Sequence, residues 1–257
     1  MIDRLPPTAF HRPQRAGGAL KPSPPILALL ALASLPASVP LLGAAPAQRN
    51  YSVTSFDRIR VDGPYQVDVR TNVAPFARAS GSPAGLDGLS LKVEGRTLII
   101  RTSSSSWGGY SGDRPGPVTI EVGTHDLGTA WVNGAGALNI DKVRGLSFEM
   151  AIQGPGTAAI GQAEVDQMKI GISGAGSARI GGSAKKLTAI VRGTSSFEAD
   201  GLAVKDAVIG AEGPTTVRAM VTGSAKVDAM GLATVALGGS PACTVKAQGS
   251  AVVTGCK

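Results

Sequence analysis

Two short segments, GAGALN at residues 134–139 and GAGSAR at residues 174–179, contain the Gly-x-Gly pattern with which dinucleotide-binding loops begin. Such a loop binds phosphate because its glycines allow backbone N–H groups to approach the ligand at the start of a helix. Both segments lack the third glycine of that fingerprint, and neither is followed by a helical pattern. These glycines therefore predict structural turns, and no cofactor is expected.

The side chains that hydrolysis or metal binding would require are scattered. When the repeats described below are aligned, no two adjacent repeats share an acidic position; the acids include Glu149, Asp166, Glu198, Asp200, Glu212 and Asp228. His125 is the only histidine after residue 47, and we expect it to lie in a loop. We predict no catalytic residue, no metal site and no enzymatic activity. The alternative is a carbohydrate-active enzyme, which would need two carboxylates about 5–10 Å apart.

Three aromatic residues are the strongest candidates for binding a partner. Trp107 and Tyr110 lie in the Gly/Ser-rich segment 102–116, and Trp131 has the alternation phase of an outward-facing residue. Exposed aromatic rings stack on sugar rings or anchor a partner protein. These three aromatic residues could instead cover the open N-terminal end of the fold, so the sequence leaves two interpretations. A glycan or an envelope protein is the expected partner.

The glycines belong to a repeat with intervals of 18 to 20 residues; its members are Gly134, Gly154, Gly174, Gly193, Gly213, Gly231 and Gly249. Gly63 occupies the same position in an earlier copy, FDRIRVDGPYQVDVR. Residues two and four before each glycine, and four and six after it, are apolar almost throughout. This alternation predicts a short strand on each side of a glycine turn, and near-constant periodicity indicates stacked coils.

The predicted fold is an all-β, right-handed, single-stranded parallel β-helix (a β-solenoid) with about 18–20 residues per coil. Like residues then stack on like residues, and the inward rows form one continuous core. We expect a single domain over residues 48–257, with irregular coils at 48–122 and regular coils at 123–257. A subunit that assembles through its coil edges is a further alternative, because solenoid ends expose unpaired strands.

Residues 1–47 resemble a signal peptide with an N-terminal extension. Basic residues precede an apolar run at 26–42, and Ala45-Pro46-Ala47 forms an A-x-A cleavage site. The run contains prolines and is short for a bilayer span, so no transmembrane segment is expected in the mature form. Of the 25 basic and 18 acidic residues, four and one lie in this segment, leaving a net charge of +4. That modest charge does not favour nucleic acid.

The two cysteines, Cys243 and Cys256, both lie near the C-terminus. In an exported chain such a pair predicts a disulfide, which would cap the last coil. Cys243 has an inward phase and Cys256 an outward one, so we expect the last coil to bend or to carry a bulge between them.

Several segments resemble the bacterial head GIN domain family, which is described as auto-transporter adhesins. The resemblance rests on FDRIRVDGPYQVDV at 56–69, VEGRTLII at 93–100 and the repeated [I/V]-x-G-x-G-x-x-x-[I/V] coils. It extends from about Phe56 to Cys256. It implies a parallel β-helical fold, an adhesion-like or scaffolding role in the cell envelope, and export to the periplasm, the outer surface or the medium. The second glycine of the family's turn is missing after Gly193, Gly213, Gly231 and Gly249.

Overall fold

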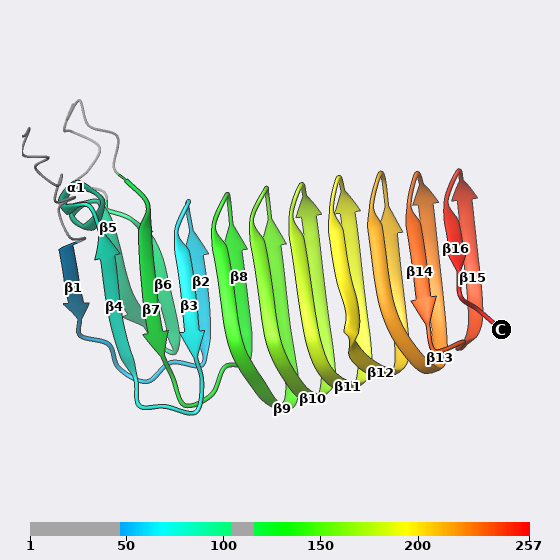
Figure 1. Cartoon of the computed structure of the whole chain (residues 1–257), viewed down its shortest axis with the longest axis horizontal. Helices are drawn as coiled ribbons and strands as arrows, with labels where there is room; N and C mark the ends of the chain where they lie inside the picture. The colour runs from blue at the N-terminus through cyan, green and yellow to red at the C-terminus, as the bar shows by residue number, and fades with distance from the viewer. Residues whose placement is uncertain (1–46, 104–115) are drawn as a thin grey trace, which may run out of the picture. The chain divides into compact units, whose positions relative to one another are not determined.

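The computed structural model describes residues 47–103 and 116–257, which belong to one compact unit (Figure 1). The elements are β1 (Ala47–Tyr51), β2 (Arg58–Asp62), β3 (Gln66–Arg70), β4 (Phe76–Gly81), α1 (Pro83–Asp87), β5 (Leu89–Glu94), β6 (Thr97–Thr102), β7 (Val118–Gly123), β8 (Thr129–Asn133), β9 (Ala137–Gln153), β10 (Thr157–Gly174), β11 (Ser177–Gly193), β12 (Ser196–Glu212), β13 (Thr216–Gly231), β14 (Thr234–Gly238), β15 (Ala242–Gly249) and β16 (Val252–Thr254).

Strands β9 to β13 form the regular coils. Each runs down one wall of the solenoid, bends at a wide turn along the lower edge of Figure 1, and returns to a tight corner along the upper edge. Neighbouring strands pair in parallel and nearly in register, so that Ile152 lies beside Ile172, and Ile172 beside Val191. The all-β parallel β-solenoid and its coil length are thus confirmed.

The core consists of the inward-facing apolar rows of both walls. These side chains alternate with exposed ones along each strand, as the pleat of a half-buried strand requires. The buried row four residues after the corner glycine shows how the coils stack: Leu138, Ala158, Ala178, Phe197, Val217 and Val235. Because most of these side chains are small, the few large ones fill a disproportionate share of the interior.

The corner glycines all have positive φ; they are Gly63, Gly134, Gly154, Gly174, Gly193, Gly213, Gly231 and Gly249. The corners also stack closely on one another. A Cβ atom at Gly174 would lie 3.1 Å from the Cα of Gly154, which is closer than ordinary packing allows. A residue without a side chain therefore satisfies both the backbone conformation and the approach of the next coil.

The later corners replace the second glycine with a small residue. At Ser195, which is buried, the hydroxyl shares its single hydrogen between the carbonyls of Gly174 (3.1 Å) and Arg192 (2.9 Å). Burying this hydroxyl therefore carries little cost. At the next corner the hydroxyl of Thr215 is buried without a partner among the described residues, so the hydrogen bonds of Ser195 explain the departure from the Gly-x-Gly pattern at its own corner.

At the N-terminal end the order of coils in space differs from their order in the chain. The coil formed by β2 and β3 lies between two others: β2 pairs in parallel with β6 and β8, and β3 pairs with β7 and β9. The coil of β6 and β7 is therefore outermost, although it follows β2 and β3 in sequence. The chain crosses back over the middle coil between β7 and β8.

Antiparallel strands close this end. On one wall β4 pairs with β7 and β1 with β4; on the other wall β5 pairs with β6. The short helix α1 connects β4 to β5, and its first turn is capped by Ser82, whose hydroxyl accepts a hydrogen bond from the N–H of Gly85 (3.1 Å). Arg49 of β1 joins this helix through an ion pair with Asp87 (2.7 Å). Residues before Val118 thus combine parallel coils with antiparallel end strands.

The C-terminal coil is made of β14, β15 and β16. β16 covers β14, whose Val235 and Leu237 are buried, whereas β15 and β16 are more exposed because no further described strand pairs with their outer edges. A disulfide joins Cys243 to Cys256 across this coil. The bend that the two phases predict occurs at Gly255, which has a φ of +90° and directly precedes Cys256. Among the described residues, no helix has the length and apolar character needed to cross a membrane.

Candidate binding surface

Trp131 lies on the outer face of β8, the first strand of the regular stack. Its neighbours Ala130 and Val132 point inward and are fully buried, which directs the indole outward, where it is half-buried. In the parallel register Trp131 lies beside Arg60 of β2 on one side and Ala151 of β9 on the other. The outward phase expected from the sequence places the ring on the surface of one wall.

A small polar network fixes the side chains beside the indole. The Asp62 carboxylate accepts a hydrogen bond from Nε of Arg60 (2.9 Å) and another from Nδ2 of Asn133 (2.6 Å). Because the carboxylate holds both partners, the guanidinium and the amide are oriented before any ligand arrives. Pre-organised polar groups next to an aromatic surface reduce the entropic cost of binding.

A hollow of about 500 Å³ surrounds this network; it is lined by Arg60, Glu94, Thr97, Ile99, Trp131, Asn133 and Gln153. It combines one aromatic ring and one aliphatic side chain with amide, hydroxyl and charged groups. Such a mixture suits a ligand that carries both apolar faces and hydroxyl groups, since each can find its own partner.

The next two coils leave the far side of the indole uncovered. In the parallel register Trp131 of β8 lies beside Ala151 of β9, and Ala151 lies beside Gly171 of β10. A Cβ atom at Gly171 would have no neighbour closer than 4.0 Å, so packing does not require this glycine. Glycine within a strand is unfavourable by roughly 0.5–1 kcal/mol relative to alanine, and it can mark a place where another molecule approaches the backbone closely.

Of the three aromatic candidates, Trp107 and Tyr110 lie outside the described residues, so the structure places only Trp131. Sequence reasoning missed the residues around it. Arg60 stands three residues before Gly63, as Trp131 does before Gly134, and this shared position could have identified their contact. Thr97 and Ile99 could not be found in that way, because their coil is stacked out of chain order.

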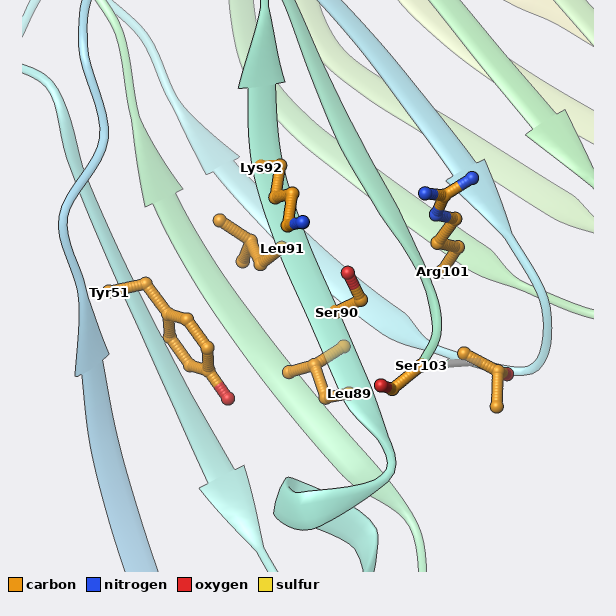
Figure 2. Close-up of a pocket in the computed structure, with 8 residues that line it drawn as sticks. Tyr51, Leu89, Ser90, Leu91, Lys92, Arg101 and Ser103 are labelled. Atoms are coloured by element: carbon orange, nitrogen blue, oxygen red, sulfur yellow. The ribbon is translucent and has the colours of Figure 1, made fainter. Parts of the chain in front are cut away.

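A second hollow of about 500 Å³ lies at the outermost coil, beside β5 (Figure 2). Its lining combines the apolar side chains of Tyr51, Leu89 and Leu91 with Lys92 and Arg101. It shares no lining residue with the hollow beside Trp131, and it has an apolar side and a basic side.

A third hollow, of about 370 Å³, lies over the wide turns of β10 to β13 and contains two acidic side chains, Glu164 and Asp166. Glu164 forms an ion pair with Arg144 (2.9 Å), and Asp166 forms one with Lys185 (2.7 Å). The carboxylates are therefore engaged with cations across neighbouring coils. On the wall that follows the corner glycines, Arg179 of β11 and Glu198 of β12 also form an ion pair (2.6 Å). This pair is part of the charge ladder between coils that the sequence predicts.

His125 lies exposed in the connection between β7 and β8, at a hollow of about 230 Å³ that also contains Asp57, Arg96 and Asp126. Asp57 forms an ion pair with Arg96. Within residues 47–103 and 116–257, no three His, Cys, Asp or Glu side chains are arranged to hold a metal ion.

Asp206, in the wide turn of β12, has a lowered pKa because the hydroxyl of Ser224 donates a hydrogen bond to its carboxylate (2.6 Å). We expect the substitution Ser224→Ala to raise the pKa of Asp206 toward its ordinary value, since the charged form loses this donor. In the wild type the folded pKa is below the unfolded one. The small stabilisation is therefore present above the ordinary carboxyl pKa and is lost as pH falls through the lowered pKa. A carboxyl-carbon NMR titration of both proteins measures this, and identical titration curves would contradict it.

The comparisons with known proteins agree with this fold. Residues 55–241 match the family described as putative auto-transporter adhesin, head GIN domain. The chain is similar in structure to a putative adhesin from Bacteroides fragilis, with a TM-score of 0.70 and 16% identity over 82% of this chain and 96% of that one. It is also similar to a putative lipid binding protein from Parabacteroides distasonis, with a TM-score of 0.64 and 18% identity over 82% and 96% of the two chains.

A third similar structure is a putative adhesin from Parabacteroides merdae, with a TM-score of 0.57 and 13% identity over 82% of this chain and 95% of that one. No curated protein matches the chain significantly. At these identities the structural likeness concerns the fold, whereas the family match covers most of the sequence. The chain belongs to the family of putative auto-transporter adhesins with a head GIN domain.

Proposed function

We propose that this protein is an exported, non-enzymatic adhesin-like solenoid that binds a saccharide at the Trp131 surface. The observation that carries the proposal is the outward indole of Trp131 beside pre-oriented Arg60 and Asn133, with a hollow on one side and the small residues Ala151 and Gly171 on the other. An indole face binds the apolar face of a sugar ring, and amide and guanidinium groups bind its hydroxyls. Family membership supports a binding role.

Export to the periplasm, the outer surface or the medium remains part of this proposal. It rests on the signal-like segment at 1–47, of which only Ala47 lies among the described residues, and on the disulfide, which persists in oxidising compartments. The absence of enzymatic activity is likewise proposed. The two carboxylates that share the wide-turn hollow, Glu164 and Asp166, each form an ion pair with a cation of a neighbouring coil. This pairing favours a charge ladder over the acid and base that glycoside hydrolysis needs.

A glycan array probed with the purified exported chain tests the proposal. We expect Trp131→Ala to lose at least about fivefold in apparent affinity for the glycans that the wild type binds, because stacking on an aromatic ring contributes roughly 1 kcal/mol or more. Trp131→Phe is expected to retain part of the binding. The indole faces outward, so neither change should unfold the protein.

Leu146→Ala is the matched control, since Leu146 is also a large apolar side chain, 79% exposed, but lies at a wide turn away from the Trp131 surface. A double variant, Trp107→Ala with Tyr110→Ala, separates the Gly/Ser-rich segment from the Trp131 surface. If Trp131→Ala binds the same glycans as the wild type with equal affinity, the proposed site is wrong.

A further inference from the structure

The strand β5 ends its wall of the solenoid with an edge that pairs with no other strand among residues 47–103 and 116–257. The N–H of Ser103 donates to the carbonyl of Gly88 (2.8 Å), which identifies these two as a hydrogen-bonded pair of the antiparallel ladder. Such pairs alternate along the ladder, so Ser90, Lys92 and Glu94 bond to β6. The N–H and C=O groups of Leu89, Leu91 and Val93 must therefore point away from β6, toward the free edge.

The hollow beside this edge has an apolar inner side. Leu89 and Leu91 point inward and are only 6% and 7% exposed, and Tyr51 of β1 lies across from them (Figure 2). The phenolic oxygen of Tyr51 is buried at this side. The pKa of the Arg49 guanidinium is raised first by its hydrogen bond to Asp87 and next by its interaction with this phenolic oxygen.

The outer side of the same edge is basic where it borders the hollow. Lys92 of β5 and Arg101 of β6 both line the hollow, whereas Glu94 lies on the same face at the far end of β5. A strand added to β5 would place alternate side chains next to Ser90 and Lys92 on the outer face. Arg101 lies opposite Ser90 on β6, one strand spacing of about 4.8 Å further away, within reach of a long carboxylate side chain. The remaining side chains of the added strand would lie over Leu89 and Leu91 on the inner face, because successive side chains of a strand point to opposite faces.

We propose that the free edge of β5 binds an extended segment of a partner protein in which apolar and acidic residues alternate. The segment adds one strand to the wall through backbone hydrogen bonds, as in β-strand addition. Its apolar side chains cover Leu89 and Leu91, and its carboxylates pair with Lys92 and Arg101. This proposal does not depend on the saccharide proposal, since the two surfaces share no lining residue.

The charges argue against a second copy of this chain as the occupant. Head-to-tail stacking would bring β5 against β15, whose exposed strand edge carries Lys246. Neither β15 nor β16 contains an acidic side chain. Like charges would therefore meet at the junction, which disfavours that assembly.

Fluorescence anisotropy with a labelled nine-residue peptide of alternating valine and glutamate tests the inference. We expect saturable binding to the full chain that weakens as salt is raised. The double reversal Lys92→Glu with Arg101→Glu should weaken this binding at least tenfold and create binding to a peptide of alternating valine and lysine. The matched control, Arg218→Glu with Lys226→Glu, reverses two exposed charges on β13 and should leave both peptides unaffected.

A backbone-modified peptide separates strand addition from simple charge attraction. The valine–glutamate peptide with alternate N-methyl groups keeps its charge but loses the donors that a ladder requires, and we expect it not to bind. Equal binding of the methylated peptide, an unchanged affinity in the Lys92 and Arg101 variant, or no binding at millimolar peptide would each overturn the proposal. Light scattering that shows chains of stacked copies at low salt would also overturn it, because the edge would then be occupied by the protein itself.

Discussion

Replacing Phe197 with alanine is expected to lower the free energy of unfolding by about 3–5 kcal/mol, the range for removing a buried aromatic side chain. Phe197 lies on β12 and is fully buried. In the stacked row its neighbours are Ala178 of β11 and Val217 of β13. Both are smaller, so the phenyl ring fills space that no adjacent side chain can reach.

The solenoid gives a reason to expect the upper part of that range. The cost of a cavity depends on how far the surroundings can collapse into it. Here the coils above and below are held at a fixed spacing by parallel hydrogen-bonded ladders on both walls. The walls therefore cannot close over the space that the ring leaves, and most of the cavity persists.

Urea unfolding followed by far-UV circular dichroism measures this effect. Phe197→Leu keeps most of the volume and should lose less than about 1.5 kcal/mol. Ile190→Ala, which truncates an outward side chain that is 45% exposed on the opposite wall, should lose less still. A loss below about 1 kcal/mol for Phe197→Ala would show that the coils do relax, which would contradict the rigid-stack argument.

The regular coils were predictable because every coil repeats the same local solution. Each corner glycine is preceded and followed by alternating apolar residues, and the contacts of one coil are those of the next. A residue's position relative to its glycine therefore determines its neighbours in space. Trp131 and Arg60, for example, meet because both stand three residues before a corner glycine.

The N-terminal end was not predictable in the same way. Strands β6 and β7 have the same alternation as β2 and β3, and nothing in that alternation tells which coil is outermost. The order depends on pairings between distant segments, such as β1 with β4 and β5 with β6. Consequently Thr97 and Ile99 reach the Trp131 surface, and β5 gains a free edge, through contacts that no local pattern encodes.

Replacing Gly193 with alanine is expected to destabilise the protein by roughly 2–6 kcal/mol, for two separable reasons. The first is conformational: Gly193 has a φ of +89°, where a residue with a side chain is strained by about 1–3 kcal/mol. The second is steric: a Cβ atom would lie 2.3 Å from the carbonyl oxygen of Gly174 in the coil below. Overpacking of this kind costs about 1–3 kcal/mol.

The oxygen of Gly174 cannot move aside without further loss. It accepts hydrogen bonds from the N–H of Thr194 (2.8 Å) and from the hydroxyl of Ser195 (3.1 Å), so displacing it breaks the contacts that join the two corners. Gly145→Ala isolates the conformational part, because Gly145 has a φ of +134° but a Cβ atom there would meet no other atom within 4 Å. Gly171 has neither a positive φ nor a close contact for a Cβ atom, so Gly171→Ala should be neutral or stabilising by up to about 1 kcal/mol.

Thermal and urea unfolding of the three variants should therefore rank Gly193→Ala as the least stable, Gly145→Ala as intermediate and Gly171→Ala as equal to or above the wild type. Equal losses at Gly193 and Gly145 would mean that the approach of successive corners adds nothing and that these glycines serve only the backbone conformation. A larger loss at Gly193 would mean that the corner glycines also determine how closely the coils stack, and hence the spacing at which outward side chains such as Arg60 and Trp131 are presented.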